Sequence, residues 1–157
     1  MPSHDILVLV AELAVAVAGF SGVVVALERR SVADWSRGEQ RHLRILLQVS
    51  ALAIIFSLFP LILRRGIDVP AFWSIALSVY GIAHVADVST FLFRPVPGES
   101  QIPPTIGFAL ALFSIGVGAF GSATFAEVTY LCVLVWHLSI AGMGFAFLIF
   151  RRNKGAA

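Results

Sequence analysis

The chain has few of the charged residues that soluble domains need. Charged side chains make up 13% of its 157 residues and apolar ones 59%, whereas soluble domains average about 25% charged and about 45–50% apolar residues. The longest polar stretch, residues 28–44, is too short to bury a core of its own. This shortage of charge predicts an integral membrane protein that is surrounded mostly by lipid.

Cysteine and the common catalytic motifs are also scarce. Cys132 is the only cysteine, which excludes a disulfide within the chain and a multi-cysteine metal site. The sequence has no phosphate-binding loop, no glycine-rich dinucleotide turn, no nucleophile elbow and no paired-histidine zinc motif. We therefore expect no enzyme activity. We also expect no nucleic-acid partner, because the Lys and Arg residues lie in short connections and near the C-terminus, where membrane topology accounts for them.

Long apolar segments are abundant. A helix that crosses a bilayer needs about 20 mainly apolar residues. Five segments meet this requirement: 6–27, 45–63, 71–93, 105–123 and 128–150. The last two form one apolar stretch that is about twice the length of a crossing, which predicts a tight turn near Gly121 and Ser122. We expect an all-α bundle of five membrane-spanning helices that forms a single domain over residues 1–157.

Capping motifs refine these boundaries. Both Ser36–Glu39 and Thr124–Glu127 match the capping-box pattern, in which the first and last side chains satisfy N–H groups at a helix start. The first motif predicts that the second helix begins near Arg37, and the second predicts the cap of the fifth helix. The adjacent Pro103 and Pro104 predict the opening turn of the fourth.

Positive charge is unevenly distributed among the predicted connections. Of the eleven Lys and Arg residues, nine lie in the first and third connections and the C-terminal tail, and only Arg64 and Arg65 lie in the second. Cytoplasmic loops carry the excess of Lys and Arg. The distribution therefore predicts an N-terminus outside the cell, a C-terminus in the cytoplasm and a location in the inner membrane.

The few ionisable groups inside the spans are the strongest functional signal. At the bilayer centre a charged side chain costs about 2.5–3.5 kcal/mol on insertion scales, so it needs a partner, water or a neutral form. The predicted spans contain no Lys or Arg to neutralise their acids. The candidates for an ion or proton path are Glu12, His84, Asp87 and His137, with Gln48, Tyr80 and Glu127 as secondary candidates. At about 1.5 Å per residue, Glu12 lies about 9 Å from the outer edge and His137 lies near the midplane.

Helical spacing places some of these groups on common faces. Tyr80, His84 and Asp87 share one face of the third span, and the last two are three residues apart, so the carboxylate can orient the imidazole. Such a pair suits a proton relay, half of a metal site or a contact that only holds helices together. In the first span, Glu12 shares a face with Val15, Gly19 and Gly22.

Small residues recur at helical spacing in two spans, which predicts faces where helices pack closely. The stripe of the first span is Ala14, Ala18, Gly22 and Ala26, and that of the fourth is Gly107, Ala111, Ser114, Gly118 and Gly121.

Three functions are compatible with this pattern. The predicted function is a small channel or transporter, acting as a homo-oligomer, that passes protons or cations along the intramembrane acids and histidines. One alternative is an accessory or assembly subunit of a larger membrane complex, in which the polar groups only secure helix contacts. The other is a b-type haem protein with His84 and His137 as axial ligands.

Overall fold

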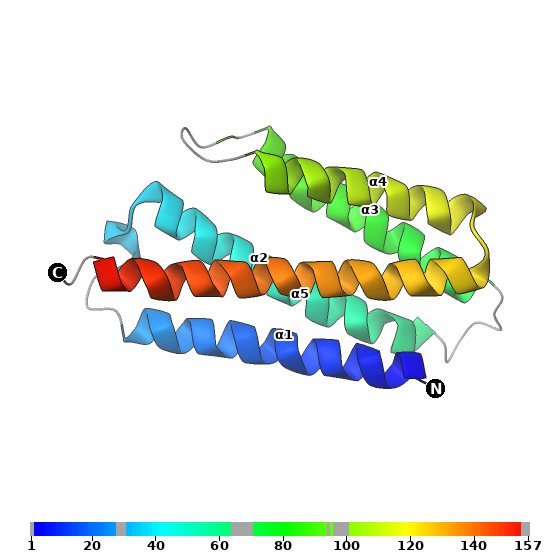
Figure 1. Cartoon of the computed structure of the whole chain (residues 1–157), viewed down its shortest axis with the longest axis horizontal. Coiled ribbons are helices and arrows are strands. Elements are labelled where there is room, and N and C mark those ends of the chain that lie inside the picture. Colours follow the sequence, from blue (N-terminus) through cyan, green and yellow to red (C-terminus); the bar gives the residue numbers. More distant parts are fainter. Residues whose placement is uncertain (1, 28–30, 64–70, 94, 96–100, 155–157) are drawn as a thin grey trace. The chain divides into compact units, whose positions relative to one another are not determined.

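The computed structural model describes residues 2–27, 31–63, 71–93, 95 and 101–154, and its regular structure in these ranges is helical (Figure 1). In chain order the elements are α1 (Pro2–Ala26), the short 3₁₀ helix η1 (Val32–Asp34), α2 (Arg37–Leu63), α3 (Phe72–Leu92), α4 (Ile102–Phe120) and α5 (Ala123–Lys154). All five α-helices are long and apolar enough to cross a membrane. The prediction of an all-α protein with five helices that could span a membrane is confirmed.

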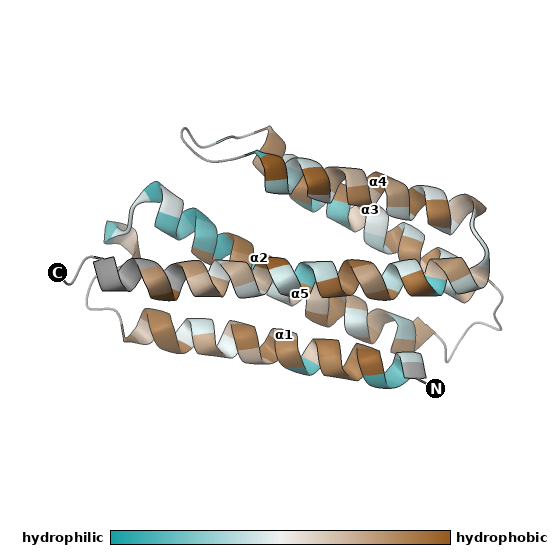
Figure 2. Cartoon of the chain, viewed as in Figure 1, coloured by the Kyte–Doolittle hydropathy of each residue, from teal (hydrophilic) through white to brown (hydrophobic). Residues whose placement is uncertain are grey.

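The start of α2 carries polar residues ahead of its apolar segment, and Figure 2 shows hydrophilic residues gathered in the first turns of α2. The predicted capping box is present. The Glu39 N–H donates to Ser36 Oγ at 3.3 Å, and the Ser36 N–H donates to Glu39 Oε2 at 2.7 Å. Because these side chains satisfy N–H groups that lack partners within the helix, α2 begins at Arg37, as predicted.

The start of α5 follows directly on the turn at Gly121 and Ser122 that the sequence predicts. The cap of α5 differs from the prediction, however. Ser122 Oγ accepts a hydrogen bond from the Phe125 N–H at 3.3 Å, so Ser122 caps the helix. The predicted capping box with Thr124 as its cap is wrong, because Thr124 already lies in the first turn of α5.

The chain forms two compact units by its internal contacts. The first unit consists of Met1–Leu58 and Leu134–Ala157. Its core cluster of Trp35, Leu43 and Leu46 packs against Val17, Val25 and Phe145, so α1, the start of α2 and the end of α5 meet there. Within this unit α1 and α5 run in the same direction and α2 runs in the opposite one (Figure 1). The expected single domain over residues 1–157 stays a prediction.

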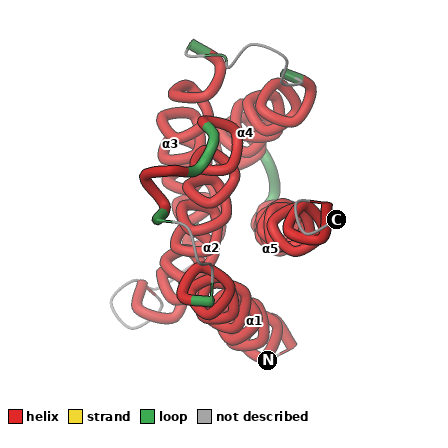
Figure 3. The backbone as a smooth tube through the Cα atoms, turned by 90° about the vertical axis from the view of Figure 1, so that its left-hand side faces the viewer, coloured by secondary structure: helices red, strands yellow, loops and turns green. Residues whose placement is uncertain are grey.

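The second unit, Phe59–Val133, is built around α3 and α4, which run antiparallel and side by side (Figures 1 and 3). Glycines allow their backbones to approach closely. A Cβ atom on Gly81 would lie 2.8 Å from the Ala111 carbonyl oxygen, and one on Gly118 would lie 2.8 Å from that of Ser74. Close approach at small residues is the usual basis of helix packing in lipid. The small-residue stripe of α4 is therefore a contact face, as predicted.

Candidate functional site

The polar face of α3 is buried. The exposed fractions of Tyr80, His84 and Asp87 are 1%, 5% and 9%. This burial is expected of a helix that crosses a membrane, because polar side chains that face lipid cost free energy. Spacings of four and three residues bring the three side chains onto one face of α3. The predicted grouping of these residues agrees with their common burial.

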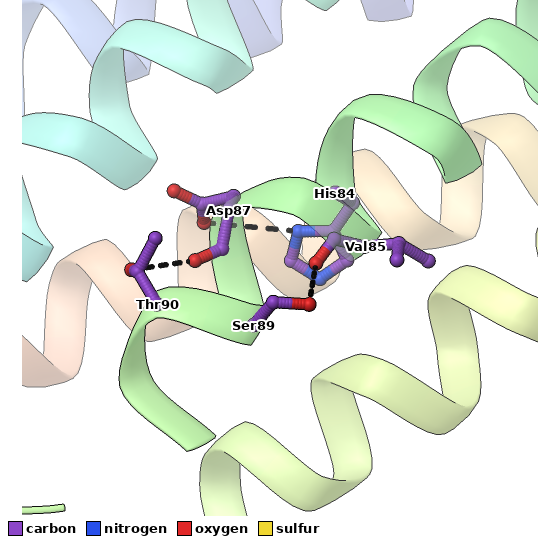
Figure 4. Close-up of polar contacts among 5 residues, drawn as sticks. All are labelled: His84, Val85, Asp87, Ser89 and Thr90. Carbon is purple, nitrogen blue, oxygen red and sulfur yellow. Dashed lines mark hydrogen bonds and ion pairs between the residues drawn. The ribbon is translucent and has the colours of Figure 1, made fainter. Parts of the chain in front are cut away.

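His84 lies at the centre of this face. Its Nδ1 atom is 4.0 Å from Asp87 Oδ2, which is within the range of an ion pair when the ring is protonated and too long for a hydrogen bond. Figure 4 shows the imidazole and the carboxylate turned toward each other from successive turns of α3. On the other side the His84 ring stacks on Tyr80, with centroids 5.6 Å apart and planes at 25°.

Helix α4 covers the second nitrogen of the His84 ring. A Cβ atom on Gly107 would lie 3.4 Å from His84 Nε2 and 3.3 Å from Val88 Cγ2. A side chain at Gly107 would thus be in tight contact with Val88 and with the imidazole. The glycine therefore lets α4 pack closely against the histidine.

Tyr130 of α5 extends this group of rings. It is fully buried, its ring meets that of Tyr80 edge-on at 6.0 Å, and it also contacts Trp73 at 5.7 Å. The resulting polar row is Trp73, Tyr130, Tyr80, His84 and Asp87. From Trp73 to Asp87 the row follows α3 for fourteen residues, or about 21 Å along the helix axis.

Sequence reasoning did not include Tyr130 or Trp73 among the site residues. Tyr130 lies seven residues before His137, two helical turns away on one face, and that spacing was the available signal. Trp73 had none, because its contact with Tyr130 joins two helices that are far apart in the sequence.

The hydroxyl groups next to the pair are satisfied within α3. Ser89 Oγ donates to the Val85 carbonyl oxygen at 2.6 Å, and Thr90 Oγ1 donates to that of Asp87 at 2.8 Å (Figure 4). Bonds of this kind to a preceding turn are usual for Ser and Thr in helices. These two hydroxyl groups therefore donate their protons to backbone carbonyls and not to the side chains of His84 and Asp87.

The other predicted residues are distributed between the two units. Glu127 is partly buried near the start of α5 in the second unit. The first unit contains Glu12, Gln48 and His137. His137 is 2% exposed, and Gln48 lies at a shallow open depression along α2 that Gln40, Leu43, Arg44 and Leu47 also line. Glu12, in contrast, lies on an exposed face of α1.

The described residues offer limited metal-binding chemistry. Within them, no group of three or more His, Cys, Asp and Glu side chains is placed to hold a metal ion. The polar row instead contains side chains of types that can carry a proton, namely an imidazole, a carboxyl group and two phenols. No protein-family profile, curated protein or solved structure matches this chain. The inference of function therefore rests on the site itself.

Proposed function

We propose that this protein carries protons across a membrane and that His84 and Asp87 are the groups that exchange them. The observation that supports this proposal is the burial of the pair inside a helix apolar enough to span the bilayer. Histidine gains and loses a proton near neutral pH, and a carboxylate beside it can orient the ring or take up its proton. The phenols of Tyr80 and Tyr130 extend the row toward the start of α3.

A proton suits this site better than a metal cation does. A dehydrated cation needs several oxygen ligands around it at once, whereas a proton needs only a series of groups that accept and release it. The row provides one carboxyl group and one phenol oxygen from α3 and a second phenol oxygen from α5, and α3 contains no Lys or Arg to oppose positive charge. Transport of small cations through the same face is the broader form of the proposal.

Glu12 and His137 remain further candidates for the path. For His137 this role is supported by its burial in a helix that is apolar enough to span a membrane. Glu12 can take this role only if a surface outside its own unit covers it, because its side chain is exposed in the first unit.

The proposed orientation has the N-terminus outside and the C-terminus in the cytoplasm of a cell with an inner membrane. The excess of Lys and Arg on one side supports it. The parallel course of α1 and α5 in the first unit also supports opposite locations for the two termini. Accessibility of a short C-terminal tag in intact and permeabilised cells tests this orientation.

The central experiment measures proton flux into liposomes that contain the purified chain, with a pH-sensitive dye inside and a potassium diffusion potential as the driving force. We expect flux with the wild type and a loss of about tenfold or more in Asp87→Asn and in His84→Gln, because positioned acid–base groups contribute factors of this size or larger. Asp87→Glu keeps the carboxyl group and is expected to restore part of the flux.

The matched control is Asp34→Asn, which makes the same chemical change at an exposed residue of η1. It is expected to leave the flux unchanged. Circular dichroism and the apparent melting temperature in detergent verify that each variant is folded. If folded Asp87→Asn and His84→Gln both carry protons at the wild-type rate, the pair is not the exchange site.

A second candidate function is an accessory subunit of a membrane complex in which these contacts only hold helices together. The tight packing of His84 against Gly107 favours it. Unchanged flux together with a loss of stability in the His84 and Asp87 variants would support this alternative.

The b-type haem alternative would require the helices around His84 to rearrange, which the proton-path proposal does not. A haem ligated through Nε2 of His84 would need α4 to move, because Gly107 lies against that nitrogen. A visible absorption spectrum of the purified protein tests the haem hypothesis directly, since bound haem produces a Soret band.

A further inference from the structure

Helix α1 has one covered and one open face in the first unit. Leu7, Val10, Ala14 and Ser21 are buried. Glu12 lies nine residues before Ser21, which is two and a half helical turns, and therefore points in the opposite direction. Its neighbours one turn away, Leu9 and Val15, are both more than half exposed. Glu12 thus stands at the centre of the face that the described residues of the first unit leave uncovered.

Glu12 also lies deep in its span. The membrane-spanning part of α1 is Ser3–Ala26, which is about 36 Å long, and Glu12 is about 14 Å from its beginning. This depth falls within a hydrocarbon core of about 30 Å. Among the described residues, Glu12 makes no hydrogen bond or ion pair. Lipid chains offer neither donors nor acceptors to a carboxyl group at that depth.

The turns of α1 after Glu12 allow a close approach by another helix. Gly19 and Gly22 are exposed, and an added Cβ atom at either position would meet nothing within 4 Å. We call the exposed surface formed by the following seven residues the open face of α1: Glu12, Val15, Ala16, Gly19, Gly22, Val23 and Ala26. It combines one polar group with four small residues, the two features that promote helix association in lipid.

We infer that a second copy of this chain packs against the open face of α1. The carboxyl group is the reason to choose a copy over a different protein. Two copies inserted in the same orientation and related by a two-fold axis bring equivalent residues together at one depth. A neutral carboxyl group both donates and accepts a hydrogen bond. Two Glu12 side chains can therefore satisfy each other, while the facing Gly19 residues let the two α1 helices approach.

The first test is disulfide cross-linking in lipid vesicles of a variant without its native cysteine, Cys132→Ser. Val15→Cys places a thiol on the open face, and Leu13→Cys places one at nearly the same depth about 160° around the helix. The native side chains at these positions are 55% and 43% exposed, so lipid reaches both. We expect mild oxidation to yield at least about five times more cross-linked dimer from Val15→Cys. Equal yields from the two variants would refute the inferred surface.

The second test measures the dimer equilibrium by energy transfer between labelled chains as they are diluted with lipid. Glu12→Leu is expected to weaken the dimer about 3- to 20-fold, the range expected for loss of one or two interhelical polar contacts. Glu12→Gln keeps a donor and an acceptor and is expected to retain most of the affinity. Leucine is well suited to a lipid-facing position, so the fold of Glu12→Leu is expected to be intact, with an unchanged melting temperature.

Two results would overturn the inference. One is a wild-type chain that stays monomeric at all lipid dilutions. The other is a dimer whose affinity is the same in wild type and Glu12→Leu. Neither result bears on the proton flux assigned to His84 and Asp87, so the two proposals succeed or fail separately.

Discussion

Helix α1 and the α3–α4 pair carry similar sequence features in different surroundings. Each combines an acidic residue with glycines in an apolar segment. In the α3–α4 pair both features are enclosed, since Asp87 is buried and Gly81 lies against the backbone of α4. In α1 both are open, since Glu12 is exposed and Gly22 has empty space beside it. The same residue types thus stabilise one contact and leave another surface available.

The partners of the two acids explain part of this difference. Asp87 has His84 three residues before it on the same helix, and the two side chains reach 4.0 Å. The residues three and four positions from Glu12, namely Val8, Leu9, Val15 and Ala16, are all apolar. When an acid has a basic group one turn away, formation of the helix places the two side chains next to each other. An acid among apolar neighbours must find its partner on another helix or another chain.

The largest expected effect is a change in the free energy of unfolding when glycines of the two regions are substituted. Gly81→Leu is expected to lower the free energy of unfolding by about 3 kcal/mol, because any side chain there collides with the Ala111 carbonyl. Gly22→Leu is expected to leave that free energy within about 0.5 kcal/mol of wild type, or to raise it, because leucine favours the helix more than glycine does. Unfolding in mixed micelles measures both. A similar loss of stability in the two variants would contradict the contrast between an enclosed and an open face.

A smaller effect is expected at the Tyr80 hydroxyl, which tests whether the enclosed row acts through its polar groups or only through its rings. Tyr80→Phe keeps the stacking on His84 and is expected to lower proton flux in liposomes several-fold, up to about tenfold. Thr90→Val is the matched control, since it removes a hydroxyl of the same helix that donates to the backbone carbonyl of Asp87. Equal flux in Tyr80→Phe and Thr90→Val would place Tyr80 outside the path.

The smallest expected effect is at the turn that joins the enclosed pair to α5. Ser122→Ala removes the acceptor for the Phe125 N–H and is expected to cost about 1 kcal/mol of stability. Thr124→Ala is expected to change stability by only a few tenths of a kcal/mol, because Thr124 lies inside the helix rather than at its cap. The same unfolding measurement compares them. A greater loss of stability in Thr124→Ala than in Ser122→Ala would favour the capping box that the sequence predicts.

Much of the fold was predictable from local sequence. Apolar length gave the five helices, and the Ser36–Glu39 motif gave the start of α2. The cap of α5 was misassigned because Ser122 and Thr124 are both residue types that cap helices well. Which of them is the cap depends on the residue at which the turn at Gly121 ends and the helix begins. Tyr130 was missed as a member of the site because its neighbours Tyr80 and Trp73 belong to a different helix.

The sequence by itself determined five helices that are long and apolar enough to span a membrane, and it determined that His84 and Asp87 form a pair, because segment length and spacing along one helix are local properties. Only the tertiary structure decided that Tyr80 and Tyr130 join this pair in a buried row, and that Glu12 faces outward. Two apolar helix faces of equal composition look alike along the chain. They differ only in which neighbouring helix comes to cover them, and that depends on the packing of segments far apart in the sequence.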